Sequence, residues 1–257
     1  MKDYRSLLQQ GSKIGGAAAG GAIGSLTGPA GTVLGAALGA AVSEACVAVL
    51  SDLANRFLSP KEEQRVAGVA AMAIEGIREK LLFEPLRNDD FFEAADSSPS
   101  AAEELFEGVL LNAKQEYEQL KLHYLANFYT NLAFETSVKR SEANYLLGIA
   151  KTLTYTQLCM LGLRSKLQCH EYKVRMHNWN YGEMVSEETQ NLAEQAEYLR
   201  QRQLLSKPSP FQANVNFNEA TILPGHTDLS TTGQRISNLM ELHTIDRRDL
   251  EALAENW

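Results

Sequence analysis

An uncharged, glycine-rich run near the N-terminus limits what this 257-residue chain can fold into more than any other feature. No charged residue lies between Lys13 and Glu44. Glycines recur along the run at intervals of three or four residues, at Gly16, Gly20, Gly24, Gly28, Gly31, Gly35 and Gly39. Four residues are close to one helical turn, so these glycines fall along one stripe that another helix backbone can approach closely. The run is predicted to be a helix-packing surface.

A proline divides the run into two arms. Pro29 follows Gly28, and a proline inside a helix costs about 3 kcal/mol. We therefore expect a glycine-zipper helical hairpin within residues 1–58. The first arm would reach only about 22 Å, short of the roughly 30 Å hydrocarbon layer of a membrane. The second arm could continue toward Leu58, but Glu44 and Asp52 argue against a simple, permanent span.

Two interpretations of the hairpin remain open at this point. It can be a tightly packed soluble hairpin within an oligomer, or it can insert into a membrane conditionally. So long an uncharged surface must be covered by lipid or by other helices. Both interpretations predict a homo-oligomer, and the second adds the inner membrane as a binding surface.

The next segments predict a connecting helix and then a helical domain. Ser59 and Pro60, followed by acidic residues, are typical of a helix start, so residues 59–101 are read as a connecting helix and a linker rich in turn residues. Residues 102–167 show helical periodicity with a predicted break near Asn112. Two shorter helices follow, and Ser141 and Thr154 are their expected caps.

The C-terminal residues 168–257 predict a winged-helix-like module. Ser186 is expected to cap a helix that ends near Leu205, and two short β-type runs at residues 211–217 and 221–223 suggest a small β-hairpin. A helix opened by Ser230 and a last helix from Asp246 complete the order. The fold class is therefore expected to be mainly α: a glycine-zipper hairpin, a helical bundle and a winged-helix-like module.

A family resemblance covers about residues 105–242. The helix around Leu125 carries a small residue and two asparagines at a fixed spacing, Ala126, Asn127 and Asn131, and Gly233 follows a later helix start. These features resemble the abortive infection alpha family of bacterial proteins, which is associated with phage defence. The chain departs from the family pattern at Gln203, where a glycine commonly closes a helix, and at Tyr155, where a proline commonly follows the capping hydroxyl.

The polar residues predict no catalytic, cofactor or metal site. The five histidines never adopt a tight metal-binding spacing, and Cys169, His170 and His177 lack a fourth ligand nearby. A serine-nucleophile elbow, a phosphate-binding loop and a zinc-protease helix are all missing from the sequence. Asn127 and Asn131 lie one helical turn apart, which suits hydrogen bonds between helices better than ligand binding.

Charge argues against nucleic acid as a partner. The net charge of −8 opposes binding to phosphate backbones. The helix from Ser186 would be the recognition helix of a DNA-binding winged helix, yet acidic residues outnumber Arg200 and Arg202 there. Protein interaction is the favoured use of this module. Three scattered cysteines fit a reducing, cytoplasmic location.

The family resemblance and the glycine run together predict a non-enzymatic phage-defence effector. In this interpretation the C-terminal region senses a protein partner or a phage-derived trigger, while the glycine zipper oligomerises and inserts into or disrupts the inner membrane. The alternative is a soluble protein-interaction or regulatory module, with nucleic-acid binding included, whose zipper only drives oligomerisation.

Overall fold

The computed structural model describes residues 40–54, 56, 58–94, 98–166, 172–174, 186–206 and 224–257. These residues are mainly helical, as predicted, and include a small two-stranded antiparallel sheet at residues other than those of the expected hairpin. The chain divides into two compact units, Met1–Thr152 (unit 1) and Leu153–Trp257 (unit 2). This division differs from the boundaries expected after residues 58, 101 and 167. The seven glycines of the predicted zipper and the hairpin expected at residues 211–223 lie outside the described residues.

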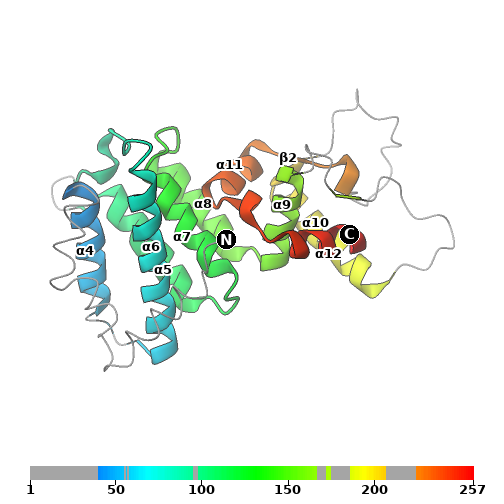
Figure 1. Ribbon diagram of the computed structural model, residues 1–257, viewed down its shortest axis with the longest axis horizontal. Helices are drawn as coiled ribbons and strands as arrows, with labels where there is room; N and C mark the ends of the chain where they lie inside the picture. The colour runs from blue at the N-terminus through cyan, green and yellow to red at the C-terminus, as the bar shows by residue number, and fades with distance from the viewer. Residues whose placement is uncertain are drawn as a thin grey trace. The chain divides into compact units, whose positions relative to one another are not determined.

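Unit 1 is a helical bundle (Figure 1). Its elements are α4 (Ala40–Ala54), α5 (Pro60–Lys80), the 3₁₀ turn η1 (Asp90–Phe92), α6 (Ala101–Gln115), α7 (Lys121–Leu132) and α8 (Arg140–Thr152). The helix α5, expected to be a connector, packs closely against α6 and α7 because its middle is apolar on most sides. The helix α4 packs against α6.

Two predicted details of unit 1 are wrong. The break expected near Asn112 lies instead after Gln115, because Leu110 and Ala113 continue the fully buried face of α6 through that point. An isolated asparagine lowers helix propensity only slightly and does not end a helix. Ser141 does not precede α8 either, since the helix already begins at Arg140.

The core of unit 1 is filled by large side chains. Phe106 of α6 and Tyr129 of α7 are fully buried, with ring centroids 4.6 Å apart. The inner face of α4 adds apolar residues that are at most 7% exposed: Val42, Ala45, Cys46, Val49, Leu50 and Leu53. Glu44 and Asp52 of the same helix are exposed. The helix α4 is therefore amphipathic, with its apolar side against protein.

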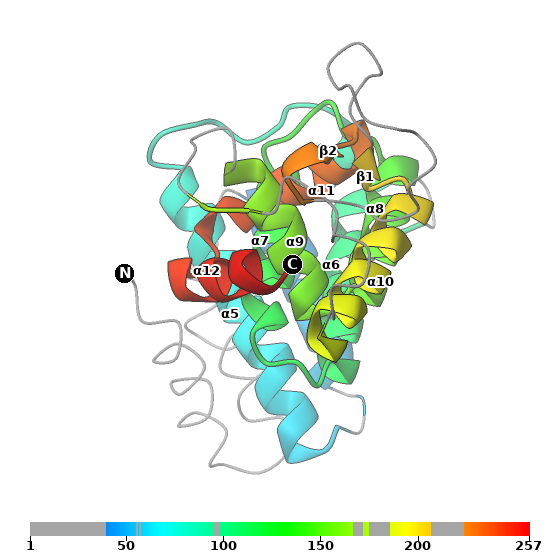
Figure 2. The same ribbon diagram turned by 90° about the vertical axis from the view of Figure 1, so that its right-hand side faces the viewer.

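Unit 2 is built around α9 (Tyr155–Lys166). The other elements are α10 (Glu187–Gln201), β1 (Leu205–Ser206), the 3₁₀ turn η3 (Pro224–His226), β2 (Asp228–Leu229), α11 (Thr231–Leu239), the 3₁₀ turn η4 (Leu242–Thr244) and α12 (Arg247–Asn256). The strands β1 and β2 lie side by side (Figure 2) and pair antiparallel, with Leu205 opposite Leu229. They flank residues 207–223 on both sides.

No helix of the described chain is long and apolar enough by itself to cross a membrane. The successive helices α8 and α9 reach the required length and hydrophobicity only when they are taken together, with a break between them.

Candidate functional site

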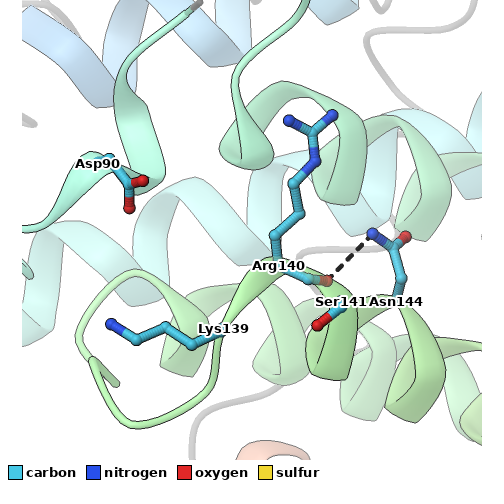
Figure 3. Close-up of a pocket in the computed structure, with 5 residues that line it drawn as sticks. All are labelled: Asp90, Lys139, Arg140, Ser141 and Asn144. Carbon is cyan, nitrogen blue, oxygen red and sulfur yellow. Dashed lines mark hydrogen bonds between the residues drawn. The ribbon is translucent and has the colours of Figure 1, made fainter.

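A pocket of about 470 Å³, lined by polar residues, opens between η1 and the start of α8 (Figure 3). It is lined by Asp90, Lys139, Arg140, Ser141 and Asn144. The side chains of Lys139 and Arg140 extend in different directions, and the Asn144 amide donates a hydrogen bond to the Arg140 carbonyl at 3.1 Å (Figure 3). Sequence reasoning missed this pocket, because η1 and α8 are about fifty residues apart in the chain.

The two cations of the pocket are already matched by carboxylates. Lys139 Nζ lies 3.2 Å from Asp89 Oδ2. The Arg140 guanidinium pairs with Glu104 of α6, and its hydrogen bond lowers the pKa of that carboxyl. An anionic ligand would have to compete with both carboxylates, and Asp90 at the rim would repel it.

A buried arginine, Arg87, binds Asp89, the residue before Asp90 of the pocket. The Arg87 side chain is 1% exposed and donates two hydrogen bonds, both 2.7 Å, to Asp89. It also donates to the carbonyls of Leu132 at 3.0 Å and Val138 at 3.1 Å. The Arg87 guanidinium holds the pKa of Asp89 well below its usual range. The pair therefore fixes the chain before η1 to the end of α7.

The asparagine motif lies on α7 and takes part in helix packing. Ala126 is a core residue, 1% exposed. The Asn127 amide lies 3.2 Å from His123 Nε2 on the same helix. Asn131 accepts a hydrogen bond from Lys80 of α5, so the interhelical bond expected of this pair is present at Asn131. Lys80 also lies over the Phe134 ring, 5.9 Å from its centroid.

Gly233, the fourth motif residue, lies in unit 2, in the first turn of α11. Its N–H donates to Ser230 Oγ at 3.0 Å, so Ser230 caps α11 as expected. A Cβ atom at Gly233 would lie only 2.0 Å from the Leu204 carbonyl oxygen. The Ser230 N–H donates to that same carbonyl at 3.0 Å. Gly233 therefore lets α11 begin directly against the turn that follows α10.

Three arginines of unit 2, Arg164, Arg200 and Arg202, interact with neighbouring groups of the same unit. Arg164 of α9 donates to the Pro224 carbonyl at 3.1 Å and pairs with Asp228, which fixes the chain that leads into β2. On α10, Arg200 pairs with Glu197, and the Arg202 guanidinium lies 4.9 Å from the Tyr198 ring centroid. Exposed carboxylates remain on this helix at Glu187, Glu188 and Glu194.

The described part of the chain holds no group of three or more histidine, cysteine or acidic residues that could bind a metal ion. Burial raises the pKa of the Cys46 thiol to about 12, and the nearby Tyr129 hydroxyl also has its pKa raised, mainly by burial. Both groups therefore stay protonated near neutral pH, and Cys46 has no thiolate character for nucleophilic chemistry.

Comparison with known proteins adds no assignment. No family model matches the chain, and neither a curated protein nor a solved structure matches it. The abortive infection resemblance drawn from Ala126, Asn127, Asn131 and Gly233 stays a prediction.

Proposed function

We propose that this chain is a non-enzymatic effector of phage defence whose glycine-rich N-terminal segment self-associates and contacts the inner membrane, while unit 2 senses a protein partner. The observation that supports this most is the anchoring of α4, which continues directly from the glycine-rich segment. Because α4 is part of the folded bundle, a movement of the glycine-rich segment would be transmitted to the bundle.

The anchor is strong by the measure of buried apolar surface. Six side chains of α4 are at most 7% exposed, and each buried valine or leucine among them stabilises by about 1.5–3 kcal/mol. Glu44 and Asp52 face solvent, where they cost nothing. Because α4 packs against α6, the N-terminal residues left to contact lipid are those before Ala40. None of the residues between Lys13 and Ala40 is charged.

A protein partner for unit 2 is supported by the charges of α10. Its exposed positions carry Glu187, Glu188 and Glu194, whereas Arg200 is paired with Glu197. Phosphate backbones require unpaired cations, so this helix suits a polypeptide better than DNA. The acidic surface is also the observation that supports the second candidate, a soluble interaction module whose glycine segment only builds oligomers.

Fractionation of the full chain with the double substitution Gly24→Leu and Gly35→Leu tests the proposal. Substitution is preferable to truncation at Ser59, because truncation would remove α4 and uncover α6. The matched control is Gly148→Leu, since a Cβ at Gly148 meets nothing within 4 Å. We expect the native chain and the control to resist a carbonate wash of membranes, and the double variant to be released and to lose phage protection.

Two results would contradict the membrane function. A native chain that stays wholly in the soluble fraction during infection would leave the soluble interaction module as the better proposal. A double variant that protects cells as well as the native chain would remove any role for the glycine segment in defence.

A further inference from the structure

Two large apolar side chains lie next to each other on the surface of unit 1, in the turn that follows α5. Leu82 is 76% exposed and Phe83 is 88% exposed. Single exposed apolar residues are ordinary on a protein surface, whereas adjacent ones are typical of a site that contacts another apolar body. The turn is therefore a candidate interaction surface.

Backbone hydrogen bonds fix this turn on both sides. The N–H groups of Phe83 and Glu84 both donate to the Lys80 carbonyl at 2.9 Å. Further on, the N–H of the buried residue Arg87 donates to the Ala133 carbonyl at 3.0 Å. The fold itself thus holds the two apolar side chains in solvent.

The helix α7 relates this turn to the start of α4. Cys46 of α4 lies beside the Tyr129 hydroxyl. A Cβ atom at Gly76 of α5 would lie 2.9 Å from Thr130 Oγ1. Tyr129 and Thr130 are neighbours in α7, so Cys46 and Gly76 lie at the same level of the bundle.

The helices α4 and α5 run in opposite directions, because only residues 55–59 join them. If both ran the same way past that level, the end of α4 and the start of α5 would be about 36 Å apart. The connection reaches at most about 21 Å. Ala40 begins α4 six residues before Cys46. Leu82 lies six residues after Gly76. Ala40 and Leu82 are therefore at the same end of unit 1.

We propose that the turn at Leu82 and Phe83 inserts into the surface of a lipid bilayer, beside the glycine-rich segment. This inference rests on the membrane contact proposed above. The glycine-rich segment joins unit 1 at Ala40, so the end of unit 1 that carries Ala40 faces the membrane that the segment contacts. Leu82 and Phe83 lie at that end. Apolar side chains of proteins at a membrane surface are buried about 5–10 Å into the boundary between headgroups and acyl chains.

Burial of apolar surface, and not charge, is the expected driving force of this contact. The cations beside the turn are paired with carboxylates: Lys80 Nζ lies 3.7 Å from Glu84 Oε1, and Arg78 Nη2 lies 3.0 Å from Glu75 Oε1. Anionic headgroups would have to compete with both carboxylates. Binding through the turn should therefore depend little on salt or on the share of anionic lipid.

A tryptophan in place of Phe83 reports on the contact directly. The full chain with Phe83→Trp is mixed with vesicles of phosphatidylethanolamine and phosphatidylglycerol that carry brominated acyl chains. We expect the added tryptophan to emit at shorter wavelength and to be quenched. Tyr117→Trp is the matched control, because Tyr117 is 83% exposed and follows the end of α6, where the Lys114 carbonyl accepts from Arg65 near the start of α5 at 3.2 Å. Its emission should not respond to the vesicles.

Removing the two apolar side chains should weaken vesicle binding. The double variant Leu82→Ser and Phe83→Ser should bind these vesicles about tenfold more weakly or worse. Its thermal midpoint should not change, because both side chains are exposed. The double variant Tyr117→Ser and Leu120→Ser changes exposed residues at the opposite end of unit 1 and should bind as the native chain does.

The outcomes separate this contact from the function it rests on. A native chain that does not bind vesicles would overturn the proposed membrane contact and the turn contact with it. Vesicle binding without a response of Phe83→Trp, or with an equal response of Tyr117→Trp, would overturn the turn contact alone. A spectral shift of Phe83→Trp that appears without lipid as protein concentration rises would assign the turn to a second copy of the chain, and would also overturn the lipid contact.

Discussion

The two units differ in what lies against their glycines. In unit 1 an added Cβ meets side chains or open space: Thr130 at 2.9 Å from Gly76, Leu147 at 2.9 Å from Gly108, and nothing within 4 Å of Gly148. In unit 2 it meets backbone, the Leu242 oxygen at 2.7 Å from Gly162 and the Leu204 oxygen at 2.0 Å from Gly233. A side chain can rotate away, whereas a hydrogen-bonded carbonyl cannot. At these glycines, unit 1 is packed by side chains and unit 2 by closely approaching backbone.

Removing volume from unit 1 should have the largest effect. Phe106 is fully buried against Tyr129, and Phe106→Ala should lower the free energy of unfolding by about 3–5 kcal/mol. Urea unfolding, with amide hydrogen exchange to localise the loss, measures this change. Reduced protection confined to α6 and α7 and their neighbours is expected. A loss below about 1 kcal/mol would contradict the idea that large side chains hold this unit.

Adding volume to unit 2 should come next. Gly233→Ala places a methyl group against the Leu204 carbonyl and should cost about 3 kcal/mol or more, because backbone must move. Hydrogen exchange in α10 and α11 should rise while α6 and α7 stay protected. Gly108→Ala in unit 1 is the matched control, with a flexible leucine tip as its nearest neighbour. Equal losses of unfolding free energy in Gly233→Ala and Gly108→Ala would contradict the difference between the two units.

The features that could be predicted from the sequence are local. Ser59 with Glu62, Ser186 with Thr189 and Ser230 with Gly233 form helix starts within three residues of sequence, so spacing alone identifies them. Thr154 caps α9 in the same way, accepting from the Gln157 N–H at 3.2 Å.

The features that escaped prediction depend on distant residues. Arg87 and Asp89 read as turn residues, yet Arg87 binds carbonyls 45 and 51 residues away. The approach of Gly233 to Leu204 depends on the turn that ends α10, which the motif around Gly233 does not encode. The pocket beside α8 escaped for the same reason, since Asp90 and Asn144 meet only in the folded bundle.

An intermediate effect is expected at the ion pair of unit 1. Asp89→Asn weakens two charge-assisted hydrogen bonds to Arg87 and should cost on the order of 2 kcal/mol at pH 7. The pKa of Asp89 is lowered in the folded state, so its stabilisation is present above the unfolded pKa of about 4 and is lost as pH falls toward the folded value. Native unit 1 should therefore lose stability in acid more steeply than the variant. Parallel curves of stability against pH would contradict this.

A smaller effect is expected where Tyr155 joins α9 to α12 in unit 2. The Tyr155 hydroxyl donates to Asp249 Oδ2 at 2.6 Å. Tyr155→Phe removes only the hydroxyl and should cost about 1–1.5 kcal/mol, because the hydrogen bond is partly exposed. Denaturant unfolding measures the change, and Asp249→Asn should cost little more when it is combined with Tyr155→Phe. Fully additive costs would show that this hydrogen bond does not couple the two helices.

The smallest effect should have the opposite sign. Gly148 lies in the middle of α8 with open space around its Cβ position, so Gly148→Ala adds no clash and restricts the unfolded chain. The variant should be more stable by about 0.5–1 kcal/mol. Urea unfolding measures this change. Gly76→Ala, whose added Cβ would meet Thr130, is measured in parallel and completes the comparison within unit 1. If Gly148→Ala were less stable than the native chain, another backbone would have to approach α8 at this position. Self-association of the native chain and of the variant, measured side by side, tests this directly.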